Sequence, residues 1–191
     1  METTSAPSPD RARAWVTPAI LLAVVGVALL FAFKASDPST WYSIFKLVHV
    51  AVAVFWVGGG LLLTALAIRA QRSDDPEDLA TIARQATFVG EKLFAPAGGI
   101  VLAMGIAMVV NLHLGFGMTW ITIALVGWAL SFVSGIAVLS PRAKRLTTLF
   151  DTVGAAAPET QAAVRQILLI ARVDVAVLLL VVIDMVAKPL F

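Results

Sequence analysis

The sequence predicts an all-α integral membrane protein, a polytopic bundle of five transmembrane helices with its N-terminus in the cytoplasm. Of the 191 residues, 60% are hydrophobic and 14% are charged, whereas soluble domains are about half apolar and about a quarter charged. Five apolar runs approach or exceed the roughly 20 residues that a helix needs to cross a bilayer. No polar stretch is long enough to build a water-facing domain, so residues 15–191 are expected to form a single bundle.

The first two spans follow a short tail. Residues 1–14 are polar and contain prolines, which predicts a flexible tail. Residues 15–33 form the first apolar run. We expect this run to be retained, because Phe33 and Lys34 follow it where a cleaved signal peptide would carry small residues. The second span covers residues 41–68, after a loop with a turn signal at Asp37-Pro38.

The remaining three spans are separated by two polar stretches. Residues 79–93 have the pattern of an amphipathic surface helix, and a proline-glycine segment from Pro96 opens the third span, which ends near Leu112. The fourth span covers residues 120–139, and Ser140-Pro141-Arg142 is expected to stop it. A helix start within residues 155–166 leads into the fifth span, residues 167–187.

Basic residues predict the orientation and the location. Eleven lysines and arginines lie on the side of the tail and of the two long polar stretches, and three lie on the other side. By the positive-inside rule the eleven face the cytoplasm, and the protein is expected in a bacterial cytoplasmic (inner) membrane. The net charge of +2 is too small to indicate nucleic-acid binding, and the lipid bilayer is the expected environment. The absence of cysteine excludes disulfides, iron–sulfur clusters and c-type haem attachment.

The second span carries the first candidate site. At about 100° per residue, His49, Ala53, Trp56 and Gly60 share one stripe of the helix. The glycine would let a flat ligand or another helix come close to the histidine. His49 could bind a metal or a haem iron through one ring nitrogen, if an acceptor holds the other. The alternative is a buried histidine that is hydrogen-bonded to a neighbouring helix.

Polar groups of three spans are expected at one level near the outer surface. Between two helices, His49 and His113 could form a bis-histidine site for haem b, with Lys46 and Lys188 near its propionates. The alternative for His113 is an ordinary loop residue. Copper would need softer ligands, such as Met104 and Met108, which more simply pack in the core. The groups at this level are Lys46, His49, His113, Asp184 and Lys188.

The fifth span contains four charged residues, and charges within a span usually face the bundle interior. Asp174 lies deepest, and Asp184 and Lys188 are spaced i,i+4, so they could pair directly. Arg172 points nearly opposite Asp174 and lies near the inner end. The group could form a proton path or hold a charged substrate, or it could only fix the packing of the helices, and the sequence leaves both interpretations open.

Three segments in order along the chain carry a more specific pattern. They are Trp41-Tyr42 with Lys46-Leu47-Val48-His49-Val50 and Trp56-Val57-Gly58-Gly59; residues 88–96 with Glu91-Lys92-Leu93; and Arg172-Val173-Asp174 with Lys188-Pro189. This pattern resembles a bacterial membrane superfamily that includes the HemJ-type protoporphyrinogen oxidases, the CopD copper-resistance membrane domain and an integral-membrane family of unknown function. The last of these is the most similar, because the helix over residues 120–139 lacks the histidine and lysine of HemJ sequences.

The resemblance implies a four-helix core over residues 41–191, with residues 15–33 as an added span. It implies haem b binding through His49 and a role beside the respiratory chain or a quinone partner. If the protein is an enzyme, we expect a haem-dependent membrane oxidoreductase, with Trp56 and Gly60 beside the cofactor. A non-catalytic membrane subunit or transport-associated protein is the alternative, and copper handling is a third hypothesis. The sequence is also compatible with a homo-oligomer.

Overall fold

The computed structural model describes residues 38–73 and 75–188, and these residues form an all-helical bundle without strands. Four of its helices are long and apolar enough to cross a membrane: Ser39–Gln71, Glu77–Asn111, Thr119–Thr152 and Pro158–Ala187. This confirms the predicted helical, multi-pass membrane protein. The predicted tail, residues 1–14, and first span, residues 15–33, lie outside the described residues, so a fifth span and a cytoplasmic N-terminus stay predictions.

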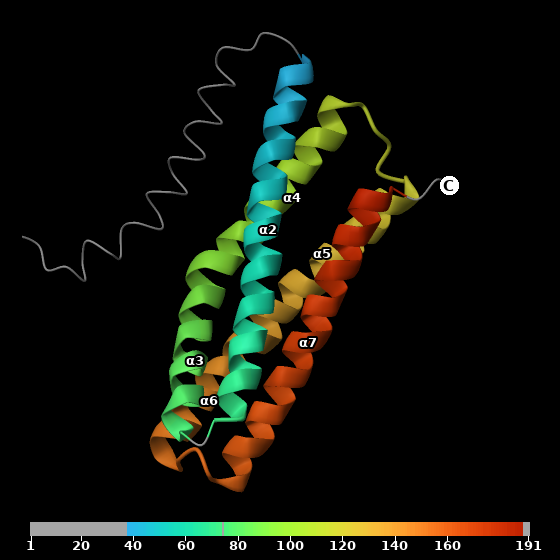
Figure 1. The fold of residues 1–191 in the computed structure, drawn as a ribbon. Helices are drawn as coiled ribbons and strands as arrows, with labels where there is room; N and C mark the ends of the chain where they lie inside the picture. Colours follow the sequence, from blue (N-terminus) through green and yellow to red (C-terminus); the bar gives the residue numbers. More distant parts are fainter. Residues whose placement is uncertain (1–37, 74, 189–191) are drawn as a thin grey trace, which may run out of the picture.

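The four long helices run antiparallel to their neighbours along the chain (Figure 1). The first is α2 (Pro38–Gln71). The second consists of α3 (Pro76–Val89), η1 (Gly90–Phe94) and α4 (Ala95–Asn111). The third consists of α5 (Thr119–Val133), η2 (Ser134–Leu139) and α6 (Ser140–Thr152), and the fourth is α7 (Pro158–Ala187).

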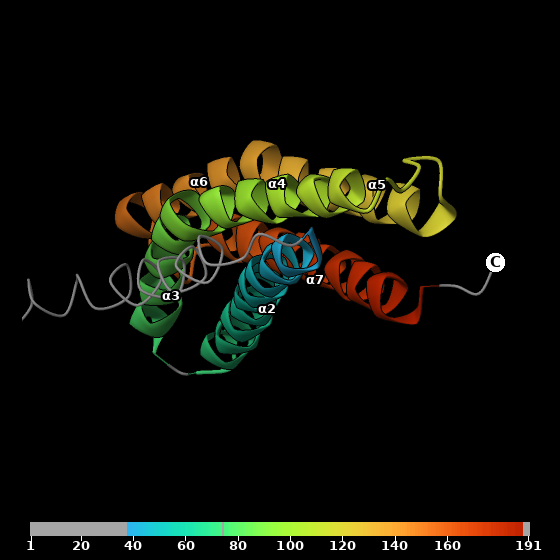
Figure 2. The same cartoon turned by 90° about the horizontal axis from the view of Figure 1, so that it is seen from above.

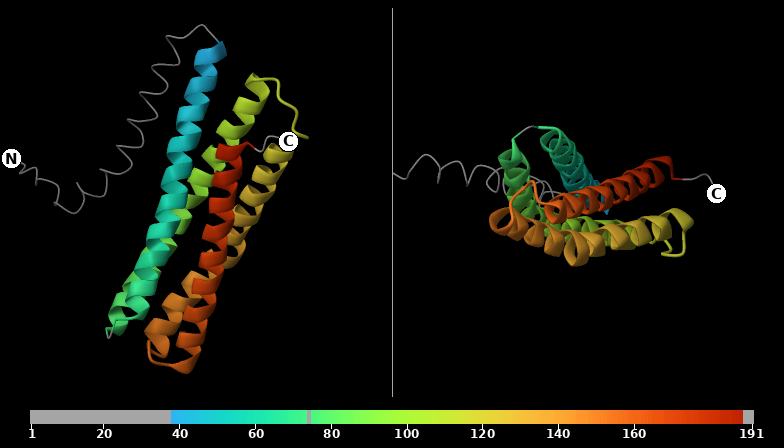
Figure 3. Two further views of the ribbon diagram at one scale, coloured as in Figure 1. Left: turned by 45° about the vertical axis from the view of Figure 1, so that its right-hand side comes forward. Right: turned by 90° about the horizontal axis from the view of Figure 1, so that it is seen from below.

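Two helix pairs make up the bundle. Helix α2 packs chiefly on α4, and α5 packs chiefly on α7. Seen from above, α4, α5 and α6 form one layer, and α2 and α7 lie on one side of it (Figure 2). Both the α2–α3 and the α6–α7 connections lie at one end of the molecule, where α3 packs against α6 (Figure 3).

The predicted separate surface helix over residues 79–93 is wrong. The helix begins at Pro76, where Asp75 caps it by accepting a hydrogen bond from the Glu77 amide at 2.9 Å, and it runs without a break to Asn111. Pro96 was expected to open a new span because proline lacks an amide hydrogen and collides with the carbonyl four residues before it. Here a single residue separates Pro96 from the π-helical turn η1, whose wider ring accommodates the proline.

The predicted stop of the fourth span at Ser140-Pro141-Arg142 is wrong for the same reason. The π-helical turn η2 precedes Pro141, and the amide of Ser140 donates to the carbonyl of Gly135, five residues back. The helix therefore continues to Thr152. At 35 and 34 residues, these two helices extend about 50 Å, well beyond the roughly 30 Å hydrocarbon core. Their α3 and α6 portions thus form one end of the bundle.

Small residues bring the helices together at several crossings, as expected for membrane bundles. A Cβ atom at Gly98 would come within 2.6 Å of the Phe132 ring and 3.3 Å of Trp56. At Gly59 it would come within 2.8 Å of the Phe94 ring. The carbonyl of Gly98 also accepts a hydrogen bond from the indole nitrogen of Trp128 at 3.0 Å. These contacts fix the middle of the bundle, where Trp56 is only 7% exposed.

Candidate functional site

His49 lies on α2 and faces α4, as the predicted stripe requires. Its Nδ1 atom is 2.8 Å from the carbonyl oxygen of Val101. Since a carbonyl only accepts hydrogen bonds, Nδ1 carries the proton and Nε2 keeps its lone pair. The ring packs at Gly105, where a Cβ atom would lie 3.2 Å from His49 Cε1. The hydrogen bond to a neighbouring helix matches the structural interpretation of this residue, and the Nε2 lone pair of the neutral ring would keep ligation chemically open.

The structure does not bring the other predicted haem-site residues to His49. His113 follows the end of helix α4 in a left-handed conformation, with φ at 53°, and its side chain is exposed. Helix α4 continues for six residues beyond Gly105, about 9 Å along its axis, and His113 lies past its end. Lys46 lies over the ring of Tyr42 at 6.0 Å, and Lys188 over the ring of Trp120 at 5.4 Å. Within the described ranges, no three histidine, aspartate or glutamate side chains gather in a way that suits a metal ion.

The ion pair suggested by the spacing of Asp184 and Lys188 does not form. Helix α7 ends at Ala187, and Lys188 adopts a left-handed conformation with φ at 36°. Its amide donates to the carbonyl of Asp184 at 2.9 Å, but its side chain leaves the helix face towards Trp120. The Oδ2 atom of Asp184 is buried and has no hydrogen-bond partner among the described residues.

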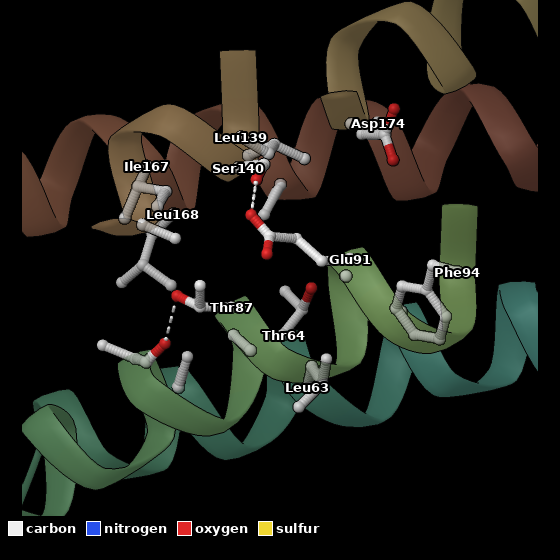
Figure 4. A pocket seen from close by; sticks show the side chains of 18 of the residues that line it. Leu63, Thr64, Thr87, Glu91, Phe94, Leu139, Ser140, Ile167, Leu168 and Asp174 are labelled. Atoms are coloured by element: carbon white, nitrogen blue, oxygen red, sulfur yellow. Dashed lines mark hydrogen bonds between the residues drawn. The ribbon is translucent and has the colours of Figure 1, made fainter. Parts of the chain in front are cut away.

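A cavity of about 670 Å³ lies between the four long helices, on the side of the two π turns. Trp56 and Gly60 line this cavity, so the C-terminal half of the predicted stripe faces it, whereas His49 does not line it. Most lining side chains are apolar, among them Leu63, Phe94 and Leu168 (Figure 4). The polar or charged lining residues are Thr64, Thr87, Glu91, Ser131, Ser140, Lys144 and Asp174.

Glu91, in the first π turn, contacts the start of α6 just after the second π turn, across the cavity wall. Its carboxylate accepts a hydrogen bond from the Ser140 hydroxyl at 2.9 Å (Figure 4) and lies 2.6 Å from the Lys144 ammonium group. Glu91 belongs to η1, and Ser140 and Lys144 belong to α6 directly after η2. These residues were not predicted as a site from the sequence. Their signal in the sequence was a proline at the edge of each of two apolar runs, Pro96 at the start of the third span and Pro141 just after the fourth.

Asp174 and Ser131 form the second polar group of the wall, and they come from facing helices. Along the antiparallel pair of α5 and α7, Asp174 lies beside Ser131, Val181 beside Gly127 and Lys188 beside Trp120. Ser131 is 2% exposed, and its Oγ atom has no hydrogen-bond partner of good geometry within the described ranges.

The basic residues near Asp174 do not neutralise it. Among the described residues, no lysine, arginine or histidine forms an ion pair with its carboxylate. Arg172 is exposed, in keeping with its predicted position away from Asp174. The side chain of Asp174 therefore faces the cavity without an ion-pair partner among the described residues.

Comparison with known proteins gives one family. The model of the family described as "Predicted integral membrane protein (DUF2269)" matches residues 43–189. No curated protein and no solved structure matches the chain. The family supports the interpretation of an integral membrane protein from a group of unknown function. The resemblance to HemJ and CopD stays a prediction.

Proposed function

We propose that this chain, which belongs to the family of predicted integral membrane proteins DUF2269, binds a lipophilic small molecule in the cavity between its four long helices. The observation that carries the proposal is the wall of this cavity, which is apolar except for a few converging polar side chains. Binding sites for small molecules typically have this character and a volume of about 300–1,000 Å³. The two π turns beside the cavity add support, because such turns are frequent at functional sites.

A bulky residue on the cavity wall tests this proposal. Thr64 lines the cavity, and the next residue of α2, Ala65, is exposed on another face. We expect Thr64→Phe to fill the space and to lower the amount of co-purified lipophilic molecule by at least about tenfold, since overpacking of about 1–3 kcal/mol opposes binding. The measurement is mass spectrometry of a solvent extract of the purified protein, normalised to protein.

The matched control is Ala65→Phe, which adds the same side chain outside the cavity and should leave the extract unchanged. Both variants are first compared with the parent chain by size-exclusion chromatography, so that misfolding is recognised. The proposal fails if the parent chain carries no stoichiometric lipophile, or if Thr64→Phe and Ala65→Phe carry the same amount.

Haem b binding through His49 is the second candidate function, and one observation favours it. The Nδ1–H group of His49 donates to the Val101 carbonyl, which is the type of contact that orients a ligating histidine and leaves Nε2 for the iron. The residues fit a haem only in part, because His49 does not line the cavity and His113 lies beyond the end of α4. A redox role beside the respiratory chain would follow from this candidate.

The haem candidate has a direct spectroscopic test. If it is correct, the detergent-purified protein will show a Soret band and sharp bands after reduction with dithionite, and His49→Ala will remove them. His113→Ala is the matched control, and we expect it to leave the spectrum unchanged because His113 is exposed at the end of α4. A blank spectrum from cells supplied with haem would end this candidate and favour a non-catalytic membrane subunit.

A further inference from the structure

One ionisable side chain on the cavity wall, that of Asp174, has no partner of opposite charge among the described residues. Three lining residues have ionisable side chains, namely Glu91, Lys144 and Asp174. Glu91 and Lys144 lie 2.6 Å apart and compensate each other. Asp174 has no cation beside it within the described ranges, and the apolar wall around it does not solvate a carboxylate. A charge in such a place is costly unless it is paired, so the wall is suited to a ligand that brings a positive charge.

Ser131 marks where the charged end of such a ligand would lie. It is only 2% exposed and lines the cavity within hydrogen-bonding reach of the Asp174 carboxylate, to which its hydroxyl can donate. The lone pairs of its Oγ atom remain for a donor on a ligand, because no described residue donates to them. Together the carboxylate and the hydroxyl present acceptor lone pairs at one point of the wall. An ammonium group has three donors and no acceptor, so it matches this pair in both charge and hydrogen bonding.

The surroundings exclude other classes of ligand on chemical grounds. At this point of the wall only two oxygen-bearing side chains, Asp174 and Ser131, come together. They are far fewer than the roughly six to eight oxygen ligands that Ca²⁺ takes, and the 670 Å³ of mainly apolar space would stay unfilled. An anionic head group would be repelled by Asp174 and would find Lys144 already paired with Glu91. A neutral lipophile would fill the space but leave the carboxylate without a counter-charge.

We infer that the cavity takes a lipophilic amine, an amphiphile whose protonated amino group pairs with Asp174 and Ser131 while its hydrocarbon part lies along the apolar wall. This inference rests on the proposed function, because it specifies the ligand class of the same cavity. The ammonium group donates to the carboxylate of Asp174 and to the Oγ atom of Ser131. The hydrocarbon part contacts lining residues such as Trp56, Phe94 and Leu178.

The test compares three probes that share one chain and differ in the head group. Purified full-length protein is incubated with dodecylamine, dodecanol or dodecanoic acid at pH 7 and separated by size-exclusion chromatography. The retained probe is then measured by mass spectrometry. Dodecylamine is protonated at this pH, as a lysine side chain is. We expect its retention to exceed that of the alcohol and the acid by at least about tenfold, the effect of one charge-assisted hydrogen bond.

Asp174→Asn keeps the shape of the side chain and removes its charge, so we expect it to lower retention of dodecylamine by at least about tenfold. Asp184→Asn is the matched control on the same helix, because Asp184 does not line the cavity. It should retain dodecylamine as the parent chain does. Asp174→Glu, which keeps the charge, should bind the amine better than Asp174→Asn and shows whether the Asn variant has merely lost its fold.

The outcomes separate this inference from the proposed function. If the amine and the alcohol are retained equally and Thr64→Phe abolishes both, the cavity binds lipophiles but the amine class is wrong. Equal retention of the amine by Asp174→Asn and the parent chain would overturn the role of Asp174. If Thr64→Phe retains every probe as the parent chain does, the proposed function and the inference both fail.

Discussion

Replacing Gly127 with alanine will lower the free energy of unfolding by about 1–3 kcal/mol, the usual cost of forcing extra volume into a packed interface. Gly127 lies where α5 crosses α7, and a Cβ atom there would overlap the Cγ2 atom of Val181 and lie 3.9 Å from Val177 Cγ1. A β-branched valine in a helix has one strongly preferred rotamer, so Val181 cannot turn away at low cost. The two helices would have to separate at the crossing.

Gly99→Ala is the matched control, because a Cβ atom at Gly99 meets no atom within 4 Å. Alanine is a better helix former than glycine by about 1 kcal/mol, so this variant should be as stable as the parent chain or slightly more stable. Both variants are compared by thermal unfolding in detergent, followed by tryptophan fluorescence. Equal melting temperatures for the two variants would show that α5 and α7 do not meet at Gly127.

Truncation of Leu146 to alanine is expected to have the larger effect, about 2–5 kcal/mol, which is typical when a buried leucine leaves a cavity behind. Leu146 is 3% exposed and joins the ends of four helices in one apolar cluster. This cluster consists of Ala70, Leu79, Ala83, Leu146, Val164 and Leu168. The measurement is the free energy of unfolding from a denaturant titration in mixed micelles.

Leu180→Ala supplies the comparison for Leu146. Leu180 is 64% exposed on α7 and does not line the cavity. Its side chain would face lipid in both the folded bundle and the separated helices, so its truncation should change stability by less than about 0.5 kcal/mol. A comparable loss at both positions would mean that the apolar cluster at this end of the bundle does not hold the four helices together.

The fold class followed from the sequence because bilayer thickness imposes a length on each apolar run. The runs of residues 41–68 and 167–187 lie within α2 and α7, and the helix start expected within residues 155–166 contains the observed start at Pro158. The two middle helices were divided wrongly at Pro96 and Pro141. Proline ordinarily ends or kinks a helix, and a local pattern does not show that a π turn will accommodate it.

The candidate site could be predicted in part. The stripe of His49, Ala53, Trp56 and Gly60 does face other helices, and Asp174 was recognised from its depth within a span. The cavity itself is the space left where helices cross at an angle, and this depends on contacts between distant segments. Pairing of Asp184 with Lys188 was inferred from helical spacing, and it fails because the helix ends one residue before Lys188.

The two π turns also fix how many residues must separate the helical portions on either side of them. Each holds about one residue more than an α-helix uses for the same advance, which rotates the helical segment after the turn by about 100° about the helix axis. The number of residues between α3 and α4, and between α5 and α6, is therefore fixed. An insertion or deletion of one residue within Gly90–Phe94 or Ser134–Leu139 would turn one portion against the other. Glu91 and Lys144 would then leave the faces on which they meet, even where the change itself spares every residue of the cavity wall.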